Sequence, residues 1–269
     1  MKAIFERALP NHFELVDSDK TATHIHISRD PPLSTEELAS LVKLALYYEE
    51  SLDKLVPQHR QGTDPYWAQS NSGDKNPALR GLPLTQRLQT VDRALLKAQE
   101  GGQGSTSAAA TARTDKRNKP VVKVMNLYDG ASNLGLSGKS KDGKPFINAK
   151  GYKWDFAGMI PLDGNIKGSG RGTVEFRQPP GSLRAEHAAT WILLGCAFVA
   201  GAVVADPSQL HAKPDGRGGS LEELEAFLYA GAAHLGWTKL YPLDELIQCA
   251  REERLPWSTP AGMEWQETM

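Results

Sequence analysis

Residues 21–28, TATHIHIS, take up a strict alternation of polar and apolar side chains from His24 onward. Ile25 and Ile27 fall on one side of this alternation, and His24 and His26 fall on the other. A period of two with β-branched residues is typical of a strand that buries one face. The stretch therefore predicts a β-strand with two histidines on its polar face.

A second stretch, TVEFR at residues 173–177, has the same organisation. Val174 and Phe176 alternate with Glu175 and Arg177, so a strand here would present a carboxylate and a guanidinium on one face. If both strands belong to one sheet, these two groups and the two histidines line a common open surface. A carboxylate and an imidazole can share a divalent metal ion, and a guanidinium can hold a phosphate group.

The remaining pattern predicts an α+β fold. In this fold an antiparallel sheet has helices packed on one face, which is its apolar face. Two capping boxes, Ser34 with Glu37 and Ser220 with Glu223, mark helix starts. We expect a single domain over residues 1–269, with a flexible insertion at about 101–119. The expected helices cover about residues 34–55, 84–99, 183–204, 220–235 and 244–253, and further strands cover about 121–128 and 152–159.

Composition excludes several classes of protein. The 269 residues contain 31 Lys and Arg against 32 Asp and Glu, so the chain lacks the basic excess of a dedicated nucleic-acid binder. The two cysteines favour a reducing, cytoplasmic location over a disulfide framework. The apolar run at residues 188–204 is shorter than the roughly 20 residues of a membrane span. We expect neither nucleic acid nor a membrane as a partner.

Five motifs, in this order, resemble the fungal amidoligase family, a branch of the glutamine-synthetase-like carboxylate–amine ligase superfamily. They are THIHIS (23–28), YYEESLDKLVPQHRQG (47–62), AQSN (68–71), YKWDF (152–156) and GTVEFRQPPGS (172–182). The resemblance implies a partial glutamine-synthetase-like catalytic fold. It also implies that His24 and Glu175 ligate metal and that Arg177 faces phosphate.

The activity that the resemblance implies is ATP-dependent formation of an amide bond through an acyl phosphate. The cofactors would be ATP and Mg²⁺ or Mn²⁺, and the substrates a small-molecule or peptide carboxylate and an amine. Arg177 would stabilise charge on the transferred phosphoryl group, and His26 would either assist there or support His24.

Three further residues are candidates for cofactor binding. Arg60 lies in a loop that matches the family pattern, where a capping and turn role is the alternative. Lys167 and Arg171 belong to a basic glycine-rich loop whose backbone amides could cradle phosphate, although such loops also serve as plain hairpin connections.

One element of the family is missing from the pattern. Members begin with a strand that carries two more metal-ligand glutamates, whereas Glu6 and Glu14 stand alone. One glutamate and one histidine are too few ligands for two Mg²⁺ ions. A truncated gene model, a degenerate paralogue that binds without catalysing, or a partner that supplies the strands would each explain this. A small metallohydrolase is a third reading of the histidine pair, but it would need further ligands.

Overall fold

The computed structural model describes residue 4 and residues 20–62, 67–101, 114–129, 145–147, 151–164, 166, 168–239 and 241–254. About half of the chain is helical, and the strands form two small antiparallel sheets, as an α+β protein requires. The strands are β1 (Ile25–Ile27), β2 (Leu127–Tyr128), β3 (Phe146–Ile147), β4 (Trp154–Asp155) and β5 (Val174–Phe176). The α-helices are α1 (Thr35–Tyr47), α2 (Glu49–Asp53), α3 (Leu84–Glu100), α4 (Lys119–Asn126), α5 (Ala185–Val204), α6 (Leu221–His234) and α7 (Leu243–Arg251). The 3-10 helices are η2 (Gln58–Arg60), η3 (Lys116–Asn118), η4 (Ala157–Met159) and η5 (Pro207–Gln209).

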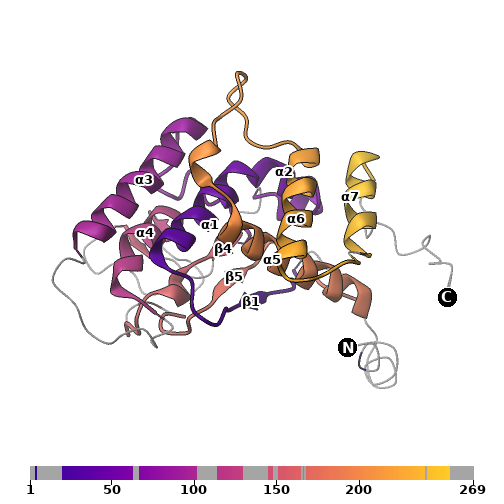
Figure 1. The fold of residues 1–269 in the computed structure, drawn as a ribbon, viewed down its shortest axis with the longest axis horizontal. Helices are drawn as coiled ribbons and strands as arrows, with labels where there is room; N and C mark the ends of the chain where they lie inside the picture. The colour runs from indigo at the N-terminus through magenta and orange to yellow at the C-terminus, as the bar shows by residue number, and fades with distance from the viewer. Residues whose placement is uncertain are drawn as a thin grey trace.

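The larger sheet joins the two segments on which the sequence argument rests. Its strand order is β1-β5-β4, and both pairings are antiparallel. Figure 1 shows these three strands side by side, with α3 and α4 towards one end of the molecule and α6 and α7 towards the other. The prediction that residues 21–28 and 173–177 form neighbouring strands is therefore confirmed.

Helix α5 packs on the apolar face of this sheet. A Cβ added to Gly195 in α5 would lie 3.0 Å from Ile27, so the helix approaches β1 closely. Trp154 stacks on Phe176 with 4.4 Å between ring centroids and lies 5.2 Å from Phe198 of α5. These aromatic contacts add to the burial of apolar surface and fix the helix against the strands.

Among the described residues, α5 is the one helix long and apolar enough to cross a membrane. In its most apolar window, however, 61% is buried inside the structure. Most of this window is therefore packed inside the structure, as in a core helix.

Both predicted capping boxes are present. In α1 and α6 the serine side chain accepts a hydrogen bond from the N3 amide, and the glutamate side chain accepts one from the N-cap amide. The helix expected over residues 34–55 is interrupted at Tyr48, between α1 and α2. The carbonyl of Tyr47 accepts a hydrogen bond from Gly219, which diverts it from the helical ladder.

One predicted strand is mostly a helix in the structure. Residues 121–128 were expected as a strand, but most of them belong to α4, where Pro120 occupies the first turn. Val121, Val122 and Val124 are buried there against α1 and α3, and this packing outweighs the β-propensity of valine. The insertion predicted at about 101–119 includes η3, whose Asn118 is buried and accepts a hydrogen bond from Thr35. Residues 102–113 lie outside the described residues.

The strand expected over residues 152–159 is shorter than predicted, because only Trp154–Asp155 pair with β5 and the chain then turns into η4. Tyr152, Trp154 and Phe156 are each at most 2% exposed. The extended chain around β4 thus buries three aromatic rings in the core.

Candidate functional site

The register of β1 and β5 places the predicted site residues on one face of the sheet. His26 lies opposite Glu175, while Ile25 pairs with Phe176 and Ile27 with Val174. Because side chains alternate between faces, the isoleucines turn towards α5 and the charged groups turn the other way. The shared face that the sequence predicted is thus present.

Four side chains make contact on this face, and we call them the polar cluster: His24, His26, Glu175 and Arg177. One oxygen of Glu175, Oε1, is 2.9 Å from Nδ1 of His24, 3.6 Å from Nε2 of His26 and 2.5 Å from Nη1 of Arg177. The same Nη1 is 3.2 Å from Nδ1 of His24. The carboxylate is therefore the common centre to which the other three side chains converge.

The polar cluster has a buried floor, formed by Glu175 and Arg177, and an exposed rim, formed by His24 and His26. The side chains of Glu175 and Arg177 are 10% and 5% exposed, whereas those of His24 and His26 are both 39% exposed. Burial by itself raises the pKa of the Glu175 carboxyl, but the hydrogen bond from His24 and the charge of Arg177 outweigh it and lower the pKa. Glu175 is therefore held as a carboxylate at neutral pH, with two imidazoles open to a ligand from solvent.

The donor set of the polar cluster does not by itself fit a pair of Mg²⁺ ions. Mg²⁺ prefers six oxygen ligands, and the cluster offers one carboxylate, which already accepts from Arg177. Among the residues that the structure describes, no group of three or more His, Cys, Asp or Glu side chains is arranged to hold a metal ion. Glu6 and Glu14 lie outside the described residues. The roles of His24 and Glu175 as metal ligands remain predictions.

Arg60 contacts the polar cluster through backbone carbonyls at and next to Arg177. Its side chain donates from Nε to the carbonyl of Gln178 at 2.9 Å and from Nη2 to the carbonyl of Arg177. The residue is 4% exposed. These contacts match the structural alternative, in which the arginine caps the end of β5, and nucleotide contact by Arg60 stays a prediction.

The glycine-rich loop precedes β5 in the chain. Gly168, Gly170 and Gly172 all have positive φ values, which suit glycine at a tight reversal of the chain. The amides of Gly170 and Gly172 donate to the carbonyls of Ile160 and Gly158. Two amides that could have cradled phosphate are therefore engaged already.

The two basic residues of that loop add little to its case. Arg171 is exposed, and Lys167 lies outside the described residues. Phosphate binding by this loop remains a prediction.

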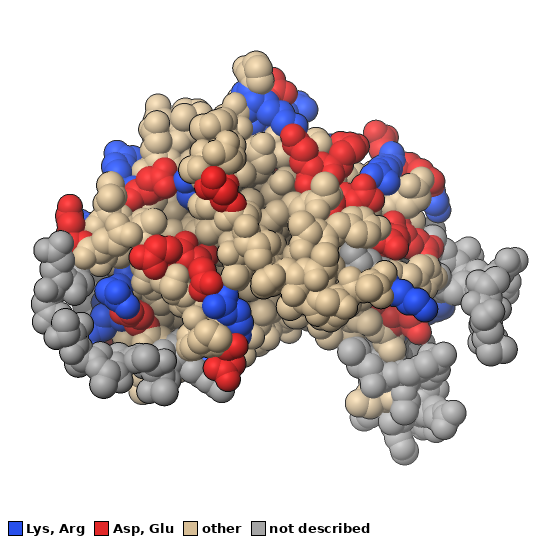
Figure 2. Space-filling model, in the orientation of Figure 1, with Lys and Arg blue, Asp and Glu red and all other residues tan. Residues whose placement is uncertain are grey.

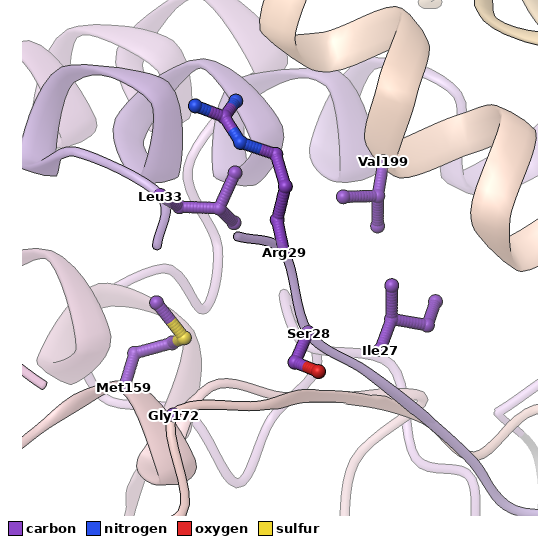
Figure 3. Close-up of a pocket in the computed structure, with 7 residues that line it drawn as sticks. All are labelled: Ile27, Ser28, Arg29, Leu33, Met159, Gly172 and Val199. Carbon is purple, nitrogen blue, oxygen red and sulfur yellow. The ribbon is translucent and has the colours of Figure 1, made fainter. Parts of the chain in front are cut away.

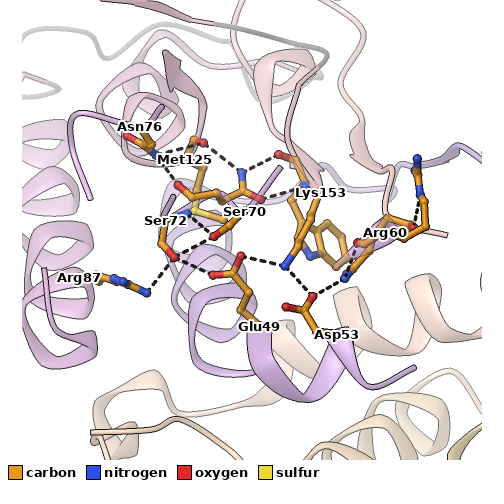
Figure 4. A network of polar contacts seen from close by, with 12 residues as sticks. Glu49, Asp53, Arg60, Ser70, Ser72, Asn76, Arg87, Met125 and Lys153 are labelled. Carbon is orange, nitrogen blue, oxygen red and sulfur yellow. Dashed lines mark hydrogen bonds and ion pairs between the residues drawn. The ribbon is translucent and has the colours of Figure 1, made fainter. Parts of the chain in front are cut away.

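A second group of charged and polar residues, which the sequence pattern did not single out, adjoins the polar cluster, since the amide of Arg177 donates to the carbonyl of Lys153. Figure 4 shows the Lys153 side chain between Glu49 and Asp53. We call Glu49, Asp53, Lys153 and Gln178 the Lys153 network. The ammonium of Lys153, on a side chain 2% exposed, is 2.5 Å from Asp53 Oδ1 and 3.3 Å from Glu49 Oε1. Gln178 donates to the same oxygen of Asp53 at 2.6 Å. A buried cation is thus neutralised by two carboxylates of α2.

The two carboxylates of the Lys153 network differ in their pKa values. Burial raises the pKa of Asp53 to about 6, since its contacts with Lys153 and Gln178 offset the loss of solvation only in part. Burial also opposes ionisation of Glu49, but the charge of Lys153 and hydrogen bonds from Ser70 and Ser72 lower its pKa. Arg87, which donates to the hydroxyl of Ser72, extends this side of the network.

The sequence carried one signal for this network. Glu49, Asp53, Lys153 and Gln178 all lie in motifs quoted for the resemblance, at 47–62, 152–156 and 172–182. Charged residues next to helices and strands are usually solvated, so the pattern alone did not distinguish them.

A small pocket lies near the end of β1, between Ile27, Leu33, Met159 and Val199 (Figure 3). Its volume of about 10 Å³ corresponds to a single water molecule. Arg29 also lines it, but its guanidinium pairs with Glu37 at 2.7 Å. The pocket is too small for a nucleotide, so the open face at the polar cluster is the better candidate for a ligand.

Comparisons with known proteins identify no relative of the chain. No protein-family model matches the chain, and no curated protein or solved structure is detectably similar to it.

Proposed function

We propose that the chain is an ATP-dependent amidoligase of the glutamine-synthetase-like superfamily, with its phosphate site at the polar cluster. One observation carries the proposal: His24 and Glu175, which are 151 positions apart in the sequence, meet at 2.9 Å beside Arg177. The resemblance assigns functional roles to these three residues.

The reaction proposed has two steps. A substrate carboxylate attacks the γ-phosphorus of ATP, and the bond from this phosphorus to the bridging oxygen breaks. The products of this step are ADP and an acyl phosphate. An amine then attacks the acyl carbon, phosphate departs, and the nitrogen loses a proton to give the amide. Such phosphoryl transfer depends mainly on positioning and on stabilisation of charge.

Each member of the polar cluster has a role in this proposal. Arg177 supplies the cation that faces the transferred phosphoryl group, and Glu175 fixes the guanidinium through its hydrogen bond. His26, on the open rim, is placed to donate to a phosphate oxygen. Mg²⁺ or Mn²⁺ at His24 and Glu175 would need more carboxylates than the described residues supply, so we assign no step to the metal.

The substrates proposed are a small-molecule or peptide carboxylate and an amine. A net charge of −1 and interspersed acidic and basic side chains on the face drawn in Figure 2 favour these over nucleic acid. The partial glutamine-synthetase-like fold is likewise a proposal, supported by the antiparallel sheet with α5 on its apolar face.

An assay of ATP hydrolysis to ADP tests the proposal. The purified chain is incubated with ATP, Mg²⁺ and a panel of amino acids and amines, and amide products are identified by mass spectrometry. We expect Glu175→Gln to reduce turnover about 100-fold, the effect of removing one group that organises transition-state charge. Arg177→Lys, which keeps the charge but not the planar fork, should reduce it as well.

The matched control is Glu37→Gln, which changes the same residue type in an ion pair with Arg29. It should retain wild-type turnover. Folding of each variant is checked by circular dichroism. Turnover that is indifferent to Glu175→Gln would show that the polar cluster is not the site.

A second candidate function is a non-catalytic binding module of the same family. It is favoured by the metal-site observation, since the described residues contain no group of ligands arranged for a metal ion. Isothermal titration with ATP in the presence and absence of Mg²⁺ separates the candidates. The ligase predicts nucleotide binding that depends on Mg²⁺, and the module predicts none.

A further inference from the structure

The backbone around Arg177 is fixed from two sides. Its amide donates to the carbonyl of Lys153 at 2.8 Å, and its own carbonyl accepts from Arg60. The carbonyl of Gln178, the next residue, accepts from Nε of Arg60 at 2.9 Å. The direction in which Arg177 leaves the strand therefore depends on Lys153, Arg60 and Gln178.

Asp53 connects two of these three residues. A single oxygen, Oδ1, accepts from Lys153 Nζ at 2.5 Å and from Gln178 Nε2 at 2.6 Å. Figure 4 shows how the carboxylate of α2 reaches Lys153 from the helix below. Lys153, whose carbonyl accepts from the Arg177 amide, and Gln178, which follows Arg177 in the chain, are thus both bonded to one carboxylate that is not part of the polar cluster.

The ionised form of Asp53 is not favoured by its surroundings. Among the described residues the charged groups that face it are Lys153 and Glu49, one attractive and one repulsive. Burial exceeds the gain from Lys153 and raises the pKa to about 6. The contacts of Asp53 with Lys153 and Gln178 therefore offset the cost of burying its charge only in part.

We infer that Asp53 is a positioning residue, which holds Lys153 and Gln178 in place so that Arg177 points to Glu175 and His24. The inference rests on the proposed function, because it assigns Asp53 a role in presenting the phosphate-binding arginine. It adds a residue of α2 to a site otherwise built on β1 and β5. If Asp53 contributed only to stability, its replacement would not change hydrogen exchange at the Arg177 amide in a variant as stable as the wild type.

The test replaces Asp53 by asparagine, which keeps the shape but removes the charge. Three quantities are measured: the dissociation constant for ATP by titration calorimetry, the urea midpoint, and amide hydrogen exchange at Arg177 by NMR. We expect ATP affinity and Arg177 amide protection each to fall about tenfold, as for loss of a hydrogen bond to a charged group. The urea midpoint should change little, because Lys153 keeps Glu49 as a partner and the cost of burying the Asp53 charge is removed. Asp53→Glu should restore most of the affinity.

The matched control is Asp92→Asn, since Asp92 also pairs with a lysine, Lys43, at 2.9 Å. It should change neither ATP affinity nor the Arg177 amide. If Asp53→Asn does not fold, Gln178→Met removes the adjoining hydrogen bond and gives the same readouts.

The outcomes separate the inference from the proposed function. Unchanged protection of the Arg177 amide in folded Asp53→Asn overturns the inference, whatever the affinity does. A wild-type chain that does not bind ATP rejects the proposed nucleotide site, and amide exchange at Arg177 still decides whether Asp53 positions this arginine.

Discussion

Replacement of Glu175 by glutamine would leave a buried guanidinium without its carboxylate. The Arg177 side chain is 5% exposed and donates to Glu175 at 2.5 Å, so the substitution uncovers a charge that water reaches poorly. Breaking such a pair costs about 3–5 kcal/mol. The lower end applies here, because the neighbouring His24 is 39% exposed and admits some water. We expect the free energy of unfolding to fall by about 3 kcal/mol.

Equilibrium urea unfolding, followed by circular dichroism, measures this loss. With a slope of about 3 kcal/mol per molar urea, the midpoint should fall by about 1 M. The control is Glu37→Gln, whose partner Arg29 is 33% exposed and for which we expect about 0–1 kcal/mol. A loss below about 1 kcal/mol for Glu175→Gln would refute the description of a buried, charge-dependent cluster.

The same pair of proteins gives a pH test. The pKa of Glu175 is lowered in the folded state from an ordinary value of 4.5, because His24 and Arg177 outweigh the effect of burial. The stabilisation is therefore fully present above pH 4.5 and is lost as the pH falls through the folded-state pKa. The difference between wild type and Glu175→Gln should shrink with acidification, and a constant difference would contradict the assignment.

Three further predictions concern other parts of the molecule. Burial raises the pKa of Asp53 from 3.8 to about 6, so wild type should gain up to about 3 kcal/mol relative to Asp53→Asn as the pH falls from about 6 to about 4. Urea unfolding of both proteins across this range measures the gain, and a difference that does not vary with pH would contradict it. Gly231→Ala would place a Cβ 1.9 Å from the carbonyl oxygen of Ala197, where α6 crosses α5. It should lower stability by about 3 kcal/mol or more, and a thermal midpoint near that of wild type would show that the helices can separate. Ser220→Ala removes the cap of α6 and should lower stability by about 1 kcal/mol, which Ser220→Asn should restore; equal midpoints for all three proteins would exclude a capping role.

Local patterns predicted the elements whose stability is local. The alternation around Ile25 and Val174 gave two strands, and the capping boxes at Ser34 and Ser220 gave two helix starts. In each case the decisive contacts lie within a few residues, either a hydrogen bond of the N-cap or the side-chain period of a strand. A short window of sequence contains both partners of such contacts, so the pattern of residues can reveal them.

Elements decided by distant contacts were predicted less well. Residues 121–128 read as a strand because of their valines, yet packing against α1 and α3 makes most of them helical. The break at Tyr48 depends on a hydrogen bond from Gly219, which is 172 residues from Tyr47. No window of the sequence contains both partners, so periodicity could not reveal either outcome.

The candidate site divides in the same way. The sequence by itself determined that His24 and His26 share one strand face and that Glu175 and Arg177 share another. Only the tertiary structure decided that the two faces coincide, because the antiparallel register sets His26 opposite Glu175.

The tertiary structure also decided that the buried Lys153 pairs with Asp53, which is partly exposed. The sequence does not show whether a charged side chain is solvated by water or paired with another charge. Its environment is created by segments that meet only when the chain folds, and that environment gives it a role.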